Sequence, residues 1–131
     1  MSVCPFCQLS TLDIVVENVF HMVIRDRYPV SVGHSLIIPK RHVASLFDLT
    51  TEEFNALYEL LHTTRQQLDA EYQPEGYNVG VNVGETAGQT VFHLHVHVIP
   101  RYAGDCADPR GGIRWIFPEK ADYWSKRETH G

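Results

Sequence analysis

One short stretch, QTVFHLHVHVIP at residues 89–100, constrains the fold of this chain more than any other. Histidines occupy every second position, at His93, His95 and His97, and apolar residues stand between them. Because successive side chains of a β-strand point to opposite faces, the stretch predicts a strand with three imidazoles on one face. The other face is expected to be buried and carries Phe92, Leu94, Val96 and Val98. Imidazoles titrate near neutral pH, bind metals and attack electrophiles. The face with the three histidines is therefore predicted to be a catalytic or metal-binding site.

The other segments predict an α+β fold. Apolar and β-branched residues predict strands over Asn18–Arg25, His34–Lys40 and Tyr77–Val83, and a short helix within residues 41–49. The third of these strands precedes the glycine-containing turn GETAGQ, so we expect it to form a hairpin with the histidine strand. This layout predicts an antiparallel sheet with its helices on one face.

A long helix is predicted over Thr51–Tyr72. Thr50 and Glu53 form a capping-box pattern at its start, and apolar residues follow at helical spacing. Tyr58 and Leu60 lie beyond the narrow apolar stripe, as a second packing surface would require.

Length and charge limit the class of protein. With 131 residues, 44% of them hydrophobic, the chain is expected to be a single domain over 1–131. Within it, residues 1–17 form a cysteine-containing segment and residues 101–131 a tail of little periodicity. The net charge of −5 argues against a nucleic-acid partner, and no apolar run approaches the roughly 20 residues that span a membrane. The N-terminus MSVCPFCQLS lacks the features of a signal peptide, so a cytoplasmic location is expected.

Three segments together resemble a known family. GQTVFHLHVHVI matches the pattern Gly-Gln-(Ser/Thr)-Val followed by His-x-His-x-His. SVGHSLIIPKRHV and CPFC resemble the family's strand with Gly-His and Pro-Lys and its N-terminal Cys-x-x-Cys. The chain therefore resembles the histidine triad (HIT) family of nucleotide hydrolases and transferases, from about residue 4 to residue 101. The resemblance implies a HIT-like fold: about five antiparallel strands, one long and one short helix, and a sheet extended across a homodimer.

The histidine pattern also predicts a nucleophile. A neutral imidazole attacks phosphorus once the negative charge of the phosphate is neutralised. His95 is flanked by His93 and His97, which can orient it and donate hydrogen bonds. The resemblance agrees, since it implies that the middle histidine transiently carries a nucleotide on its α-phosphorus before water releases it. It also implies that His97 contacts the phosphate or the leaving-group oxygen.

Four polar residues are candidates for substrate binding. Gln89 and Thr90 directly precede the histidine stretch, and Asn82 lies on the neighbouring predicted strand, so all three can bind the same phosphate. By resemblance, Asp26 occupies the position that binds ribose hydroxyls, and a carboxylate can accept hydrogen bonds from both hydroxyls of a cis-diol. The alternative for each is a structural role, namely turn formation or strand capping.

Cys4 and Cys7 have the spacing with which two thiolates bind one tetrahedral zinc ion. By resemblance, His42 and His93 complete the site, and His93 becomes a structural ligand close to His95. In a small domain, metal-binding energy becomes folding energy. One alternative is a metal-free His93 that orients His95. A redox Cys-x-x-Cys is the other, although no helix signal follows Cys7 as that motif requires.

The other histidines, His21, His34, His62 and His130, are given no catalytic role, and His34 is assigned to a structural Gly-His turn.

The leading prediction is an enzyme that cleaves at the α-phosphorus of a dinucleoside polyphosphate or a nucleoside phosphoramidate through a nucleotidyl-His95 intermediate. By resemblance, the Pro100-Arg101 ending favours polyphosphates slightly. The alternative function is a nucleotide-binding or sensing module with incidental turnover. The tail either contacts polyphosphate, often in the partner subunit's site by resemblance, or forms a surface loop whose aromatic residues cover core.

Overall fold

The computed structural model describes residues 4–8 and 13–125 of the chain. The chain divides into two compact units, Met1–Arg101 and Tyr102–Gly131, and this division falls at the start of the predicted tail. Within the described ranges, no helix is both long enough and apolar enough to cross a membrane.

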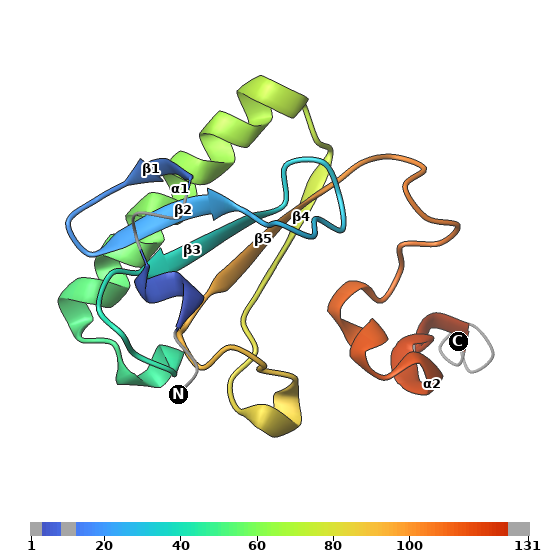
Figure 1. Cartoon of the computed structure of the whole chain (residues 1–131). Helices are drawn as coiled ribbons and strands as arrows, with labels where there is room; N and C mark the ends of the chain where they lie inside the picture. The colour runs from blue at the N-terminus through green and yellow to red at the C-terminus, as the bar shows by residue number, and fades with distance from the viewer. Residues whose placement is uncertain (1–3, 9–12, 126–131) are drawn as a thin grey trace. The chain divides into compact units, whose positions relative to one another are not determined.

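The first unit is built on a five-stranded antiparallel sheet (Figure 1). The strands lie in the order β1-β2-β3-β5-β4, and every neighbouring pair is antiparallel. Their bounds are β1 Ile14–Glu17, β2 His21–Arg25, β3 Ser35–Pro39, β4 Gly76–Gly80 and β5 Val96–Arg101. The predicted α+β fold is confirmed, although the residue pattern had not located β1.

One long helix accompanies the sheet. α1 spans Thr51–Tyr72, the range predicted from the capping box and the apolar spacing. The predicted short helix within residues 41–49 is a single 3₁₀ turn, η3. Among the described residues, the first unit has 3₁₀ turns at η1 Pro5–Cys7, η3 Leu46–Asp48 and η4 Glu85–Ala87.

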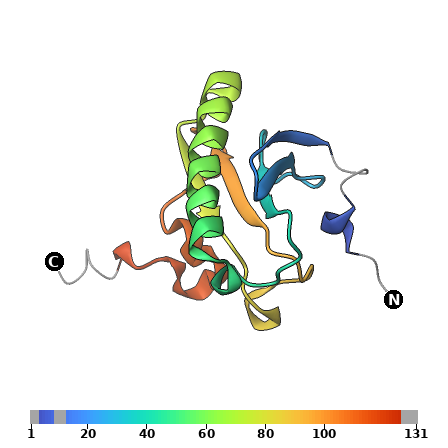
Figure 2. The ribbon, with the colours of Figure 1, turned by 90° about the vertical axis from the view of Figure 1, so that its left-hand side faces the viewer.

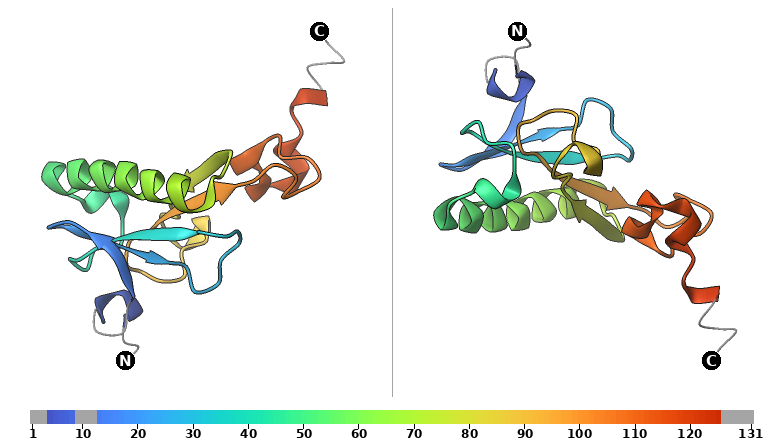
Figure 3. Two further views of the ribbon diagram at one scale, coloured as in Figure 1. Left: turned by 90° about the horizontal axis from the view of Figure 1, so that it is seen from above. Right: turned by 90° about the horizontal axis from the view of Figure 1, so that it is seen from below.

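The two faces of the sheet carry different partners (Figures 2 and 3). α1 covers one face, where Leu57, Leu60 and Leu68 pack with Val23, Ile37, Val96 and Val98 in the main core. The opposite face carries a smaller buried cluster, with the Phe6 ring packed against it; its members are Met22, Ile24, Leu36 and Ile38. The N-terminal segment and α1 therefore lie on opposite sides of the sheet.

The strand formed by the histidine stretch begins at a later residue than the alternating pattern predicts. β5 begins at Val96, and the preceding residues leave the ladder, where the Leu94 amide donates to the Val43 carbonyl at 2.7 Å. Leu94, Val96 and Val98 are buried as expected, but Phe92 is 50% exposed and His93 is fully buried. The prediction of one strand with Phe92 in the core was therefore wrong, because the alternation holds only where a neighbouring strand pairs.

A capping box and an ion pair between buried Glu53 and half-exposed Arg41 stabilise the start of α1. Thr50 Oγ1 accepts from the Glu53 amide at 3.1 Å, and Glu53 Oε1 accepts from the Thr50 amide at 2.9 Å, which completes the capping box. Arg41 donates to both carboxylate oxygens of Glu53, at 2.9 and 3.0 Å. The hydrogen bonds from Arg41, followed by that from Thr50, lower the pKa of Glu53 to about 2.

Replacement of Glu53 by glutamine should lower the free energy of unfolding by about 1–3 kcal/mol at pH 7, since Arg41 loses its paired carboxylate. A depressed carboxyl pKa stabilises the fold above the ordinary value of 4.5 and ceases to do so as the pH falls toward 2. The difference from wild type in urea unfolding should therefore shrink over that range. The exposed neighbour Glu52→Gln is the control, and equal stabilities at pH 7 would contradict the prediction.

The second unit packs around a glycine and two tryptophans. It contains η5 Gly112–Ile116 and a short helix, α2 Pro118–Ala121. Gly111 has φ +93°, and a Cβ there would lie 3.1 Å from the Ala121 carbonyl and 3.3 Å from both tryptophan rings, so a glycine is required. The Arg110 guanidinium lies 4.5 Å from the centre of the Trp124 ring. Several large apolar side chains of this unit remain exposed, namely Ile113, Trp115, Ile116, Phe117 and Tyr123.

Candidate active site and metal centre

The histidine side chains lie on the sheet face opposite α1. His97 is paired with Leu36 across β5 and β3, and Leu36 belongs to the buried cluster of that face. The His95 ring lies 5.3 Å from the His97 ring, centre to centre. Both side chains are half-buried, so they are held by the sheet and still reach solvent.

His95 is held through one ring nitrogen. Its Nδ1 lies 2.8 Å from the His93 backbone carbonyl. A carbonyl can only accept, so Nδ1 carries the proton of the neutral ring and Nε2 keeps a lone pair. His95 therefore has the tautomer that a nucleophile at Nε2 requires.

His97 has the opposite tautomer, and His34 sets it. The Val30 amide donates to His34 Nδ1 at 3.2 Å, so neutral His34 carries its proton on Nε2. That nitrogen lies 3.0 Å from His97 Nδ1, which must then accept, leaving the His97 proton on Nε2. Burial lowers the pKa of both rings, and neighbouring imidazoles lower that of His97 further, which favours these neutral forms.

Sequence reasoning missed that His34 contacts the histidine triad, where its Nε2 lies 3.0 Å from His97 Nδ1. Its assignment to a structural turn overlooked that His34 and Leu36 share a face, which makes His34 a diagonal neighbour of His97. The turn itself is real, because Gly33 has φ +90° and a Cβ there would lie 2.9 Å from Tyr72 Cδ2. Period-two alternation within residues 34–36 carries the signal, but only once the pairing of β3 with β5 is known.

Asp26 joins this network. Its Oδ2 lies 3.4 Å from His34 Nε2, and its Oδ1 accepts from the Tyr28 amide at 2.8 Å. The structure thus places the predicted ribose-binding carboxylate beside the histidines. Asp26 is half-buried, so its remaining acceptor positions can still face solvent.

Gln89 is buried and structurally engaged. Its Nε2 donates to the Ala44 and Val91 carbonyls at 2.9 and 3.2 Å, and its Oε1 accepts from the Gly84 amide at 2.9 Å. Both protons of the side-chain amide therefore donate to backbone carbonyls, which is the structural role given above as the alternative to phosphate binding. In this arrangement Gln89 orders the loop before the histidines.

Thr90 and Asn82 are exposed. Asn82 was expected to lie on the strand that precedes the turn, but β4 ends at Gly80, so Asn82 lies just beyond that strand. A role of these two side chains in phosphate binding stays a prediction.

The four predicted zinc ligands converge. Cys7 Sγ lies 3.1 Å from His42 Nδ1, Cys4 Sγ lies 3.4 Å from His93 Nδ1, and the two Nδ1 atoms are 3.2 Å apart. All four donor atoms lie within 4.8 Å of one another. Ligands arranged tetrahedrally about zinc at 2.0–2.3 Å are separated by roughly 3.3–3.8 Å. The donor set and its spacing therefore fit a tetrahedral zinc ion.

The orientation of His93 also fits metal binding. Its Nε2 lies 2.7 Å from the Pro39 carbonyl and must donate a hydrogen bond to it. The proton is therefore on Nε2, and the lone pair of Nδ1, which faces the cysteines, can bind a metal. Burial, followed by the neighbouring His42 and His95, lowers the pKa of His93 and keeps the ring neutral. A metal bound at Nδ1 would thus leave the backbone carbonyl of His93 to hold His95.

The chain is similar to known proteins of one family. The HIT domain family model matches residues 10–104. The Bacillus subtilis protein named Protein hit is 36% identical over 103 residues, 76% of this chain and 71% of that protein. AP-4-A phosphorylase of Mycobacterium tuberculosis is 34% identical over 107 residues, 77% of this chain and 55% of that protein. The crystal structure of a zinc-bound histidine triad family protein from Mycobacterium smegmatis has a TM-score of 0.71 at 27% identity, covering 98% of this chain and 97% of that one.

Proposed function

The chain belongs to the HIT domain family, and from this premise we propose that it cleaves at the α-phosphorus of a dinucleoside polyphosphate or a nucleoside phosphoramidate. The observation that carries the proposal is the pair of opposite tautomers at neighbouring histidines. His95 presents a lone pair at Nε2, while His97 presents an N–H at its own Nε2. A nucleophile beside a donor is what displacement at a charged phosphorus requires.

In the first step, His95 Nε2 attacks the α-phosphorus, and a P–N bond forms as the bond to the leaving group breaks. The His97 N–H stabilises the charge that develops on the phosphoryl or leaving-group oxygen. A phosphate leaves as a stable anion, whereas an amine must depart with a proton, which the His97 N–H would donate before solvent restores it. In the second step, water attacks the same phosphorus and gives up a proton to solvent, while the electron pair of the P–N bond returns to His95 and the nucleoside monophosphate is released.

The substrate contacts divide between two regions. Asp26, beside His34, is proposed to bind the ribose hydroxyls. Thr90 and Asn82, both exposed, are proposed to contact phosphate oxygens. The similarity to AP-4-A phosphorylase supports a dinucleoside polyphosphate as substrate, although this chain spans only 55% of that protein.

A structural zinc ion is part of the proposal, held by Cys4, Cys7, His42 and His93. When bound, it would join the N-terminal segment to the segment that carries His95. The zinc-bound relative from Mycobacterium smegmatis supports this assignment. Reduced thiols suit the reducing conditions of the cytoplasm, the location that we propose.

Steady-state turnover of diadenosine polyphosphates and of adenosine phosphoramidate tests the function. We expect release of AMP from at least one of the two classes, and the ratio of kcat/KM identifies the preferred leaving group. Rates at background for both classes, combined with measurable nucleotide binding, would contradict an enzyme and favour the sensing alternative.

His34 should matter for catalysis more than for binding. His34→Ala removes the donor that holds His97 in its tautomer, so we expect kcat to fall by about 10- to 100-fold with little change in KM. His34→Gln keeps an N–H donor and should lose less. An increase in KM at unchanged kcat would instead make His34 a binding residue.

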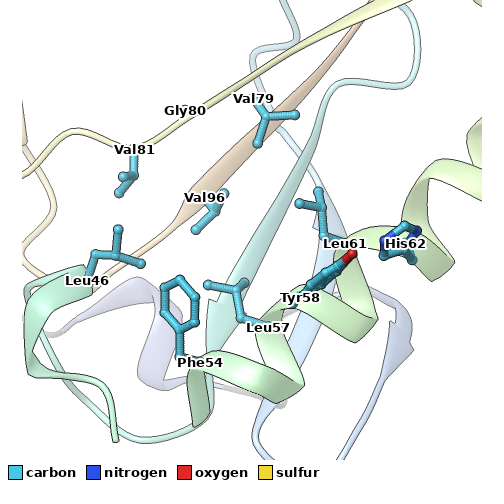
Figure 4. A pocket seen from close by; sticks show the side chains of 10 residues that line it. All are labelled: Leu46, Phe54, Leu57, Tyr58, Leu61, His62, Val79, Gly80, Val81 and Val96. Carbon is cyan, nitrogen blue, oxygen red and sulfur yellow. The ribbon is translucent and has the colours of Figure 1, made fainter. Parts of the chain in front are cut away.

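We also propose that the chain forms a homodimer through an apolar groove beside α1. Figure 4 shows Phe54, Leu57, Tyr58 and Leu61 of α1 facing Val79, Val81 and Val96 across the groove. Phe54 and Tyr58 are 50% and 53% exposed, although a helix beside a core usually turns such residues inward. They form a second apolar stripe on α1, which the sequence indicated at Tyr58. The same expectation for Leu60 was wrong, because Leu60 is 3% exposed and packs in the main core. β4, the adjoining edge strand, also leaves backbone groups for pairing.

Light scattering at micromolar concentration should give about 30 kDa, twice the 15.0 kDa chain. Tyr58→Arg, which places a charge in the groove, should shift the mass toward the monomer. Val19→Arg, at an 81% exposed position outside the groove, is the control. A wild-type particle of 15 kDa would contradict the dimer.

A further inference from the structure

Phe6, one of the two residues between Cys4 and Cys7, packs beside the His95 ring. The Phe6 ring lies 5.2 Å from the His95 ring, centre to centre, and meets the His93 ring edge-on at 5.9 Å. It also packs against the apolar cluster on the sheet face opposite α1. Phe6 thus fills the space between the core of that face and the side of the His95 imidazole.

His95 needs this second support. Its hydrogen bond to the His93 carbonyl fixes the position of Nδ1 but leaves the ring free to tilt about that contact. His97 lies near one side of the ring, at 5.3 Å and 64° between planes, and Phe6 lies at 5.2 Å and 57°. With these two rings as neighbours, the direction of the Nε2 lone pair is restricted.

The placement of Phe6 depends on the cysteines. The segment around Phe6 is a single 3₁₀ turn of three residues, too short to be stable by itself. Cys4 and Cys7 tie its two ends to His93 and His42. A metal ion at these four ligands would turn weak thiol contacts into coordination bonds and hold the turn, with Phe6, against the sheet.

We propose that Phe6 is a positioning residue for His95, and that metal binding at Cys4 and Cys7 keeps Phe6 against the imidazole. The metal centre and the nucleophile are thereby coupled through an aromatic side chain as well as through the backbone of His93. This inference rests on the proposed function for the role of His95 as nucleophile.

Kinetics of Phe6→Ala provide the first test. We expect kcat to fall by about 10-fold while KM changes by less than about 3-fold and the zinc content is unchanged. Phe6→Leu, which keeps apolar bulk, should recover most of kcat, and Phe47→Ala, at an 82% exposed position, is the matched control. A rise in KM at constant kcat would make Phe6 a substrate-binding wall and overturn the proposal.

A double-mutant cycle tests the coupling to metal. Cys7→Ser should remove zinc and lower kcat, whereas Cys106→Ser, at an exposed cysteine of the second unit, should do neither. If the metal acts through Phe6, adding Phe6→Ala to Cys7→Ser should cause no further loss. Losses that multiply would show that the two act independently and contradict the coupling.

A measurement without substrate separates this inference from the proposed function. In ¹⁵N-histidine-labelled protein, His95 signals, assigned by difference from His95→Asn, should show the single Nδ1–H tautomer. Removal of zinc, or Phe6→Ala, should broaden or average them. Unchanged His95 signals would overturn the inference whether or not the protein turns over nucleotides, and absent turnover with the expected change would overturn only the function.

Discussion

His95→Asn is expected to abolish turnover, with kcat lowered by about 10³-fold or more, because the asparagine amide has no lone pair able to attack phosphorus. Nucleotide affinity should stay within a few-fold of wild type, since His97, Asp26 and the shape of the site remain. Rapid-quench kinetics should also show that the variant forms no covalent nucleotidyl intermediate. Trapping the wild-type intermediate and locating it on His95 by mass spectrometry completes the test.

Two comparisons sharpen this result. His62→Asn, on α1 at the groove, should keep its activity as long as light scattering shows an unchanged mass, and then shows that a histidine-to-asparagine change alone is harmless. His97→Asn keeps a donor and should lose less than His95→Asn. Near-normal turnover by His95→Asn would end the mechanism proposed for this site.

Metal removal is the second large effect that we expect. Purified protein should carry about one zinc per chain, as closed four-ligand sites do. With free zinc about 1,000-fold above its dissociation constant, binding stabilises the fold by about 4 kcal/mol. Loss of zinc to a chelator should therefore lower Tm by on the order of 10 °C. Elemental analysis and thermal unfolding measure both quantities.

Cys4→Ser should lose the metal and its stabilisation together, while Cys106→Ser should lose neither. Adding zinc back should restore the wild-type Tm and leave that of Cys4→Ser unchanged. Protein that has never met a chelator and contains no zinc would return His93 to the metal-free alternative, in which it only orients His95.

The long helix was the most predictable element. Thr50 and Glu53 satisfy each other's backbone amides within one turn, and the apolar residues of α1 repeat at helical spacing, so local sequence decides both its start and its course. Even for this helix, the residues that are buried differ from those that the apolar spacing predicts. Glu53 and Thr64 are buried, whereas Phe54 points into the groove, because the residues that meet the sheet depend on how α1 crosses it.

The cysteine and histidine ligands show how spacing and tertiary structure divide the information. The Cys-x-x-Cys spacing predicts a half-site from sequence alone. His42 and His93 were assigned by resemblance, and they join the cysteines only because the chain returns to the same place from 35 and 86 residues away. A local sequence pattern cannot predict contacts between residues that are so far apart along the chain.

The alternation within residues 94–98 could be predicted from the residues alone: Leu94, Val96 and Val98 pack into the core, and His95 and His97 lie on the other side. Three contacts could not be predicted in this way: His93 lies outside the sheet and faces the cysteines, Gln89 donates its amide protons to loop carbonyls, and His34 contacts His97. Alternation is a property of a single strand, whereas these contacts depend on the register between β3 and β5 and on segments that pack against the sheet from outside.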